Sequence, residues 1–276
     1  MSSITIEQIS TFLDVALIAA RAGGVILQNY WGKQFNVTEK GRAGDLLTEV
    51  DQKSEQEIIT VIKRHCPQHN ILAEESGKID NQNHQYLWVI DPLDGTTNYA
   101  HGYPQAAVSV GLIVEGIPTV GVVYNPMTQE LWSAGKGLGA TLNYNKIQVS
   151  TTDNLADSLL VTGFAYDRRE TDDNNYAEFC YLTHLTQGVR RGGSASLDLC
   201  YVACGRLDGY WERGLKPWDL LAGVVILEEA GGIISAYDES KFELESGRIL
   251  ATNGNIHTAL SKALLYTPHS PNFSFS

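Results

Sequence analysis

The stretch WVIDPLDGTTNYAHGYP, residues 88–104, places the strongest constraint on how this chain can fold. An apolar run that is typical of a buried strand leads into Asp91 and Asp94, with a proline between the two aspartates. Burying two carboxylates of like charge is costly unless each has a partner. The fold must therefore either expose this end of the strand or supply something that holds the two charges.

Two interpretations of the motif compete. Asp, Pro and Gly all favour β-turns, so DPLDG is compatible with an ordinary turn. Alternatively, Asp91 and Asp94 point the same way around a proline-fixed turn, and the carbonyl of Leu93 turns toward the same point. Oxygen ligands of this kind suit Mg²⁺. Gly95 would let the backbone approach an anion closely, and Thr96 offers a hydroxyl and an N–H group to a phosphate.

Acidic residues in two distant segments favour the metal interpretation. ILAEES ends a strand-like run in Glu74 and Glu75, and GLKPWDLLAG places Asp219 in the first turn of an apolar helix. Taken alone, these residues have ordinary explanations, which are a solvated turn for the glutamates and a favourable charge at a helix N-terminus for Asp219. Together with Asp91 and Asp94 they predict a site for two divalent cations, the usual arrangement for in-line displacement at phosphorus.

The segment RRGGSASLDL suggests a further anion site. Gly192 and Gly193 precede Ser194 at the start of a predicted helix, which suits a phosphate but equally suits a glycine turn with a serine cap. The chain has no GxxxxGK[ST] motif, which excludes a P-loop nucleotide enzyme. GKGLGA lies between predicted strands, where a hairpin turn explains its glycines.

Composition and charge limit the classes of partner and location. The formal net charge of −12 argues against nucleic acid or an anionic membrane as a partner, and it is compatible with a site that gathers cations. The four cysteines form no CxxC pair and show no zinc-finger spacing to histidine. The N-terminus lacks the features of a secretory signal, and no apolar run approaches about 18 residues, so we expect no transmembrane helix and a cytoplasmic location.

Hydrophobic periodicity predicts an α+β fold. We expect helices over the first 30 residues, over 47–66, and near 175–185, 194–204, 217–230 and 256–265. NVTEKGRAGDLLTEVD is predicted to be an exposed, mobile loop, and the tail TPHSPNFSFS is predicted to fray. Short segments rich in β-branched residues, punctuated by glycines and Asn-Pro, predict an antiparallel meander over 105–150. We expect residues 1–150 and 151–276 to form two parts of one compact unit.

The motifs DPLDGTTN and PWDLLAG, together with ILAEES upstream, resemble those of the inositol monophosphatase family. This family belongs to the magnesium-dependent, lithium-sensitive phosphatase superfamily, and the RRGGSASLDLCYVACGRLDGYWERGLKPWD block is similar to its bacterial branch. The resemblance spans essentially the whole chain. It implies a layered αβαβα sandwich of the inositol monophosphatase and fructose-1,6-bisphosphatase type, and a homodimer.

The resemblance also implies a role for each candidate residue. A first, activating Mg²⁺ would be held by Glu74, Asp91 and the Leu93 carbonyl. A second Mg²⁺ would be held by Asp91, Asp94 and Asp219, and a third, weaker ion by Glu74, with Lys40 nearby on a mobile loop. Asp51 would bond Thr96, and Thr96 and Glu74 would orient the attacking water. The amides of Gly95 and Thr96 would contact the phosphate, and the inositol hydroxyls would face Gly193, Ser194, Ala195 and Glu212.

The activity that the resemblance implies is hydrolysis of myo-inositol 1-phosphate, a small-molecule phosphate ester. Two positions depart from the animal enzymes: Lys216 stands where a histidine is found, and Ser194 replaces a threonine. A lysine beside the pocket would suit a second anionic group on the substrate or a dimer interface. Fructose 1,6-bisphosphate and histidinol phosphate therefore remain alternative substrates. A regulatory protein-binding role is the alternative of a different class, because some bacterial relatives associate with the transcription machinery.

Overall fold

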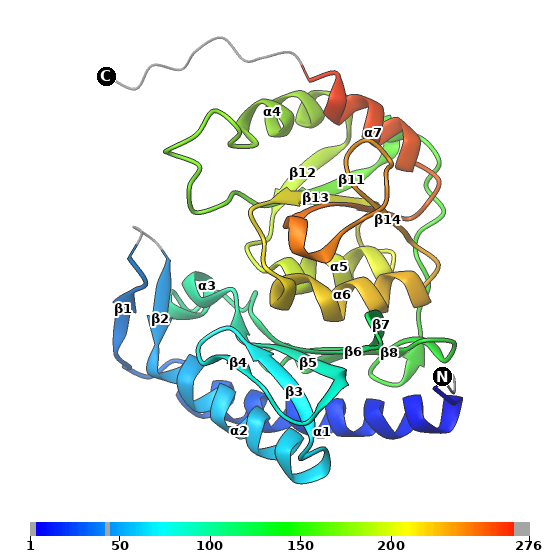
Figure 1. Cartoon of the computed structure of the whole chain (residues 1–276). Coiled ribbons are helices and arrows are strands. Elements are labelled where there is room, and N and C mark those ends of the chain that lie inside the picture. Colours follow the sequence, from blue (N-terminus) through cyan, green and yellow to red (C-terminus); the bar gives the residue numbers. More distant parts are fainter. Residues whose placement is uncertain (1–3, 42–44, 268–276) are drawn as a thin grey trace.

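The computed structural model describes residues 4–41 and 45–267, which fold into five alternating layers of helices and sheets (Figure 1). The first layer is formed by α1 (Ile6–Tyr30) and α2 (Glu49–His65), and it covers the outer face of the larger sheet. The middle layer between the two sheets is formed by α5 (Ala195–Ala203) and α6 (Pro217–Glu229). The last layer is formed by α4 (Tyr176–Leu185) and α7 (His257–Leu265), so the predicted α+β, αβαβα architecture is confirmed.

The larger sheet has eight strands within the described residues, in the order β10-β9-β8-β7-β6-β5-β3-β4. Its neighbours are antiparallel except β3 and β5, which run parallel. The meander predicted for residues 105–150 is present as the run from β6 to β10. The strands of this sheet are β3 (His69–Ala73), β4 (Gly77–Ile79), β5 (Asn83–Asp94), β6 (Ala107–Val114), β7 (Ile117–Asn125), β8 (Glu130–Gly135), β9 (Gly139–Leu142) and β10 (Asn145–Lys146).

The smaller sheet has five strands within the described residues, in the order β12-β11-β13-β15-β14. It is mixed, because β11 runs parallel to β12 and β13, whereas β15 runs antiparallel to β13 and β14. The division of the chain at residue 150 into two parts stays a prediction. The strands are β11 (Leu159–Thr162), β12 (Gly188–Arg191), β13 (Gly209–Arg213), β14 (Ile233–Ser235) and β15 (Arg248–Thr252), with short 3₁₀ turns η1 (Leu155–Asp157) and η2 (Leu244–Ser246).

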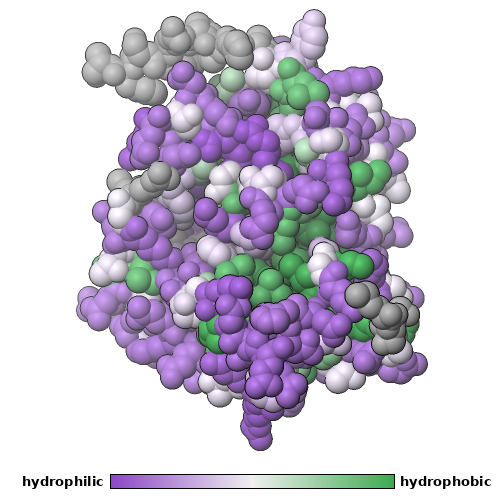
Figure 2. Space-filling view, viewed as in Figure 1, coloured by the Kyte–Doolittle hydropathy of each residue, from purple (hydrophilic) through white to green (hydrophobic). Residues whose placement is uncertain are grey.

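Buried hydrophobic side chains fill each of the spaces between adjoining layers. Trp88 lies in the core between the first helical layer and the larger sheet, Trp132 lies in the core around the middle helices, and Trp211 lies in the core beneath α4 and α7. Figure 2 shows hydrophobic residues gathered across the middle of this face, at the level of the middle helical layer, with hydrophilic residues over most of the remainder. The layers are therefore held together chiefly by apolar burial.

One segment differs from its prediction. Residues within NVTEKGRAGDLLTEVD, expected to be an exposed loop, form a short antiparallel hairpin of β1 (Val37–Glu39) and β2 (Leu46–Thr48). The Lys40 amide donates to the Asp45 carbonyl over 2.8 Å, which closes the hairpin. The prediction was wrong because charged side chains and glycines hid the strand signal of a two-stranded element without a core face. Residues 42–44, and the predicted fraying tail from residue 268 onward, lie outside the described residues.

Helix α1 is the element whose composition bears on a membrane. Among the described residues it is the helix that is long and apolar enough to cross one, with a mean hydropathy of 1.6 over its most apolar window. Core helices of soluble proteins meet the same criterion. Here α1 packs against α2, β6 and β7 and buries Ala16, Ala19, Ala20 and Leu27. The buried apolar side chains of α1 are thus part of the core between the helices and the larger sheet.

A pair of facing glycines lets α6 approach the larger sheet closely. Gly111 on β6 and Gly121 on β7 are register partners. A Cβ atom at Gly121 would lie 2.3 Å from the Ala222 carbonyl oxygen, and one at Gly111 would lie 2.6 Å from Leu221 Cδ2. Both distances are shorter than a van der Waals contact; at position 121 the neighbour is backbone, so only glycine fits there, whereas at position 111 the Leu221 side chain would have to shift. The pair sets the height of α6 above the sheet, and with it the position of Asp219 in the first turn of α6.

We expect Gly121→Ala to lower the free energy of unfolding by about 3 kcal/mol, because its added carbon meets a backbone carbonyl that cannot rotate away. Urea denaturation monitored by tryptophan fluorescence measures the effect. Gly209→Ala is the matched control, since its Cβ would lie 3.0 Å from Leu260 Cδ2, the far end of a flexible side chain. The control should lose much less stability. Equal losses in the two variants would contradict the close-approach explanation.

Candidate active site

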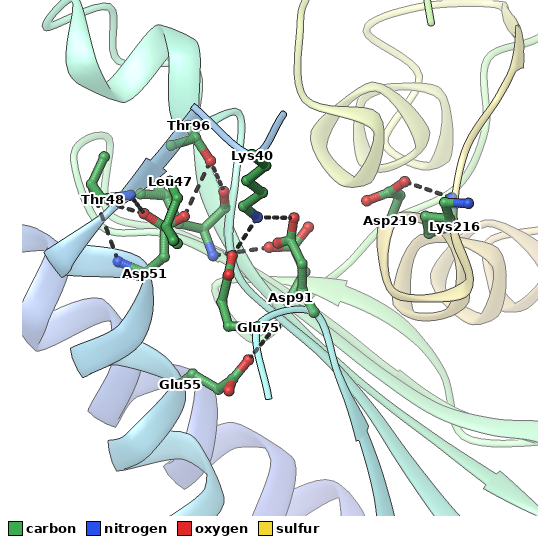
Figure 3. Close-up of polar contacts among 12 residues, drawn as sticks. Lys40, Leu47, Thr48, Asp51, Glu55, Glu75, Asp91, Thr96, Lys216 and Asp219 are labelled. Atoms are coloured by element: carbon green, nitrogen blue, oxygen red, sulfur yellow. Dashed lines mark hydrogen bonds and ion pairs between the residues drawn. The ribbon is translucent and has the colours of Figure 1, made fainter. Parts of the chain in front are cut away.

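The parallel pairing of β3 and β5 brings two of the predicted acids to one edge of the larger sheet. Ala73 is the register partner of Ile90, so the residues that follow, Glu74 and Asp91, lie side by side. The Glu74 amide donates to the Ile90 carbonyl over 3.2 Å, and the carboxyl groups of Glu74 and Asp91 share a hydrogen bond. Asp219 on α6 lies across from this edge in Figure 3. Residues that are 145 positions apart in the chain thus face one region.

The DPLDG motif is the end of a strand and not an exposed turn. Strand β5 continues to Asp94, which pairs with Ala107, and its register shifts between Asp91 and Asp94. Asp91 Oδ1 accepts a hydrogen bond from the Leu93 amide over 2.9 Å, which stabilises this irregularity. Gly95 follows with a φ of 88°, and α3 (Thr96–Ala100) begins directly after it. Of the two interpretations of the motif, the ordinary turn is therefore wrong.

Gly95 is required by both its conformation and its surroundings. Its positive φ is a conformation that side chains rarely adopt, and a Cβ atom would lie 2.7 Å from the Gln105 carbonyl oxygen. The close approach holds the start of α3 against the chain that leads into β6. The amides of Gly95 and Thr96 are thereby placed just beyond the two aspartates.

The buried carboxylates at this edge repel one another. Burial raises the pKa of Asp91 well above its usual range, and the charges of Glu74, Asp94 and Asp219 raise it further. Burial likewise raises the pKa of Asp219, and the charge of Asp94 adds to the effect. Asp91 is 2% exposed. Negative charge in excess at a buried site is the condition that a bound cation relieves.

Asp94 is held by donors from the middle helical layer. Its Oδ2 accepts hydrogen bonds from Ser194 Oγ at 2.7 Å, the Ser196 amide at 2.8 Å and Ser196 Oγ at 2.6 Å, and the Ala195 amide also donates to it. The start of α5, predicted as a separate phosphate cradle, is therefore directed at a carboxylate of the protein itself. In this arrangement Ser194, expected to face the substrate, is buried against Asp94.

The contact expected between Asp51 and Thr96 is present. Thr96 Oγ lies 3.2 Å from Asp51 Oδ1 and 2.9 Å from the Leu93 carbonyl oxygen (Figure 3). Asp51 Oδ2 accepts from the amide and hydroxyl of Thr48, which caps α2. Burial raises the pKa of Asp51 to about 6. A threonine hydroxyl that donates its hydrogen to either oxygen keeps lone pairs free to accept a hydrogen bond from water.

Lys40 reaches from the β1–β2 hairpin to the same edge. Its Nζ lies 2.8 Å from Glu74 Oε1 and 2.5 Å from Glu75 Oε1. Burial acts to lower the pKa of the Lys40 ammonium, but the charges of Glu74 and Glu75 and their hydrogen bonds outweigh it and raise the pKa. Glu55 on α2 accepts from the amides of Glu75 and Ser76 and fixes the turn after β3.

Several of these supporting residues were missed in the sequence. Glu55 had a signal, because it lies four positions after Asp51 on one face of a helix. Ser196 and Asn98 had none, since their partners are distant in the chain. Asn98 Nδ2 donates to the carbonyls of Gln105 and Gly192 at 2.8 and 3.0 Å, which ties α3 to the turn before α5. Lys216 is exposed, and its backbone amide donates to Asp219 Oδ2 over 2.7 Å.

The predicted ligands do not form a closed coordination shell. In the part of the chain that the structure describes, no group of three or more His, Cys, Asp or Glu side chains is arranged to hold a metal ion. The carboxylates are near enough to perturb one another, yet each is engaged by a donor of the protein: Glu74 by Lys40, Asp91 by the Leu93 amide, Asp94 by the serines of α5, and Asp219 by the Lys216 amide.

Glu212 lies near the end of β13 and is buried. Its Oε2 accepts from Tyr210 Oη over 2.7 Å, and a Cβ atom at Gly163 would lie 2.0 Å from its Oε1. Burial raises the pKa of Glu212 to about 7. Gly193, with a φ of 86°, packs against Asn98 and the Arg191 guanidinium.

Glu212 should make stability depend on pH. Its pKa is raised in the folded chain, so its contribution is fully present below the unfolded value of about 4.5 and is lost as pH rises through about 7. Between pH 5 and 8 the wild-type chain should therefore lose up to about 3 kcal/mol relative to Glu212→Gln, which keeps the bond from Tyr210. Chemical denaturation of both proteins at the two pH values measures this. Parallel pH profiles would contradict the burial of an ionising carboxyl at Glu212.

Comparison with known proteins shows which family the chain belongs to. The sequence profile of the Inositol monophosphatase family matches residues 8–267. The chain is 62% identical over 262 residues to an Inositol-1-monophosphatase of Synechocystis, with 95% of this chain and 91% of the relative covered. It is 43% identical over 267 residues to the Nus factor SuhB of Pseudomonas aeruginosa, covering 94% of this chain and 97% of that protein.

A solved structure agrees with these relatives. The inositol monophosphatase from Anabaena (Nostoc) superposes with a TM-score of 0.86 and is 58% identical, with 94% of this chain and 97% of that chain covered. Fold, motifs and overall similarity thus coincide over nearly the whole length, and the chain belongs to the inositol monophosphatase family.

Proposed function

We propose that this protein is a phosphomonoesterase that hydrolyses myo-inositol 1-phosphate with the help of Mg²⁺. The observation that carries the proposal is the set of mutually repelling carboxylates around Asp91, which converge from β3, β5 and α6. The similarity to inositol monophosphatases of Synechocystis and Anabaena supports the choice of ester.

The residues present fit a divalent cation. Their donors are carboxylate and carbonyl oxygens, the ligands that Mg²⁺ prefers, and the buried negative charge exceeds what Lys40 neutralises. Two or three ions would be held by Glu74, Asp91, the Leu93 carbonyl, Asp94 and Asp219, with Lys40 beside the weakest. When bound, Mg²⁺ lowers the pKa of water and neutralises charge on the phosphate oxygens.

The chain's own residues position the reactants, which is most of what phosphoryl transfer requires. Asp51 holds the Thr96 hydroxyl so that its lone pairs accept from the attacking water, and Glu74 orients the same water from the other strand. The amides of Gly95 and Thr96 donate to the phosphate. The ring hydroxyls would face Gly193, Ser194, Ala195 and Glu212, with Ser194, which is buried against Asp94, acting through that carboxylate.

A panel of phosphate esters tests the substrate. We expect myo-inositol 1-phosphate to be hydrolysed with a kcat/KM at least about tenfold higher than fructose 1,6-bisphosphate or histidinol phosphate, a difference of about 1.4 kcal/mol in transition-state stabilisation. Released phosphate is measured at a fixed Mg²⁺ concentration. A higher kcat/KM for either alternative ester would contradict the proposal that inositol phosphate is the substrate.

Removal of the metal and of one ligand tests the site. Treatment with EDTA should abolish phosphate release, Mg²⁺ should restore it, and millimolar Li⁺ should inhibit.

Asp94→Asn should lower kcat by about a thousandfold or more, because a neutral amide is a poor ligand for a hard cation. The Asn oxygen can still accept from Ser194 and Ser196, so the melting temperature should change little. Asp153→Asn, at an exposed position, is the control. Full activity of Asp94→Asn would contradict the site.

A binding role stands beside the enzymatic one. The 43% identity to a Nus factor of Pseudomonas aeruginosa favours a protein partner as a second candidate function. The acidic net charge of −12 gives no support to direct binding of nucleic acid. A cytoplasmic, homodimeric enzyme is part of the same proposal, and light scattering during size-exclusion chromatography tests the dimer.

A further inference from the structure

Two glycines lie side by side where neighbouring parallel strands of the smaller sheet end. Thr162 at the end of β11 and Arg191 at the end of β12 are register partners, so the next residues, Gly163 and Gly192, are neighbours as well. Paired residues of parallel strands point to the same face of a sheet, and adjacent strands lie about 4.8 Å apart. Any groups that occupy the side-chain positions of these two glycines are therefore neighbours on one face.

A carboxyl group occupies each of these two positions. A Cβ atom at Gly163 would lie 2.0 Å from Glu212 Oε1, and one at Gly192 would lie 2.0 Å from Asp198 Oδ1. Glu212 belongs to β13 and Asp198 to α5, and these two elements pack against each other in the structure (Figure 1). The two acids are thus brought together at the carboxyl ends of the parallel strands, from different elements.

Asp198 has no partner that would compensate for its burial. It is 1% exposed, and neither of its carboxyl oxygens makes a hydrogen bond to another residue that the structure describes. The guanidinium of Arg191 lies instead against Gly193, where a Cβ atom would be 2.2 Å from its Nη1. A buried polar group without a partner costs stability and is rare in native proteins. Packing alone therefore does not account for an acid at position 198.

The surroundings of Asp198 favour its protonated form. Burial raises the pKa of Asp198 well above its usual range, and the charges of Glu212 and Asp94 raise it further, whereas the charge of Arg191 acts to lower it. A protonated carboxyl group has one O–H donor. Glu212 is a suitable acceptor, since Tyr210 Oη donates only to its Oε2, over 2.7 Å. A buried water commonly bridges neighbouring polar groups that make no direct hydrogen bond.

We propose that Asp198 is a positioning residue whose protonated carboxyl donates, through one buried water, to Glu212 and holds that carboxylate toward the substrate ring. The inference rests on the proposed function, in which Glu212 faces the ring hydroxyls. Tyr210 and the bridging water restrain the Glu212 carboxylate from two sides, so a hydroxyl of the substrate meets an acceptor of fixed orientation. Asp198 itself does not touch the substrate.

Two esters separate the ring hydroxyls from the phosphate: myo-inositol 1-phosphate, and phenyl phosphate, which has no hydroxyls beyond the phosphate. For Asp198→Ala, at a fixed Mg²⁺ concentration, we expect the KM for inositol phosphate to rise about fivefold, the effect of one neutral hydrogen bond, with kcat little changed. The KM for phenyl phosphate should not change. The conservative variant Asp198→Asn keeps the shape and supplies an N–H donor, so it should restore the KM for inositol phosphate to nearly the wild-type value.

Asp208→Ala is the matched control, because Asp208 is a buried acid whose partners are present. It is 7% exposed, and it accepts from Ser150 Oγ over 2.5 Å and from the Leu159 amide over 2.7 Å. Its loss should lower the melting temperature and leave the ratio of the two KM values unchanged. Asp198→Ala should lower the melting temperature much less, because it removes a buried acid that has no partner.

Three results would each overturn the inference. They are an unchanged KM of Asp198→Ala for inositol phosphate, an equal rise for both esters, and a rise in Asp198→Asn as large as that in Asp198→Ala, which would mean that position 198 acts through its charge. A wild-type chain that hydrolyses phenyl phosphate but not inositol phosphate would instead overturn the proposed function, so the two failures are distinguishable.

Discussion

The hydrogen bonds between Asp94 and the start of α5 are the interaction on which the site depends. They join the end of a strand in the larger sheet to the middle helical layer, across about a hundred positions of sequence. An ionised carboxylate receiving several donors, two of them backbone amides at a helix N-terminus, is stabilised by hydrogen bonds and by the helix dipole. Without these donors Asp94 would be a buried charge beside Asp91 and Asp219, and the edge of the sheet would repel α6.

The position of the candidate site also depends on two places where backbone segments approach closely. Gly121 lets α6 lie on β7, and Gly95 lets the start of α3 turn against the chain before β6. Because neither glycine has a side chain, the neighbouring backbone can approach closely at both positions. Asp219 and the Thr96 amide therefore reach one region from different layers. The hydrophobic cores around Trp88 and Trp132 then hold those layers at fixed spacing. Positioning of the candidate site is thus a property of sheet and helix packing and not of its loops alone.

The sequence predicted those features that depend on local pattern. The α+β layering, the meander and the helices followed from hydrophobic period and from glycine punctuation, and the acids at Glu74, Asp91 and Asp219 followed from residue type at strand and helix ends. The roles carried over from the family resemblance remain proposals. Features that depend on long-range pairing were not accessible: the hydrogen bond from Ser194 to Asp94, the hydrogen bond from Asn98 to Gly192, and the ion pair of Arg213 with Asp167. The β1–β2 hairpin was missed for a different reason, since so short a pair of strands carries no periodic signal.

The parallel pairing of β3 with β5 has a consequence for how the chain tolerates changes in length. Successive side chains alternate between the two faces of a sheet, so a one-residue deletion in β3 would turn Glu74 away from Asp91 and toward α2. Strand β4 and the exposed turn after it form the return path between the two strands and carry none of the acids. Insertions are therefore best tolerated at the exposed residues Asp80 and Gln82 of the turn after β4, whereas the distance from Leu72 to Glu74 admits no insertion without loss of the acid pair.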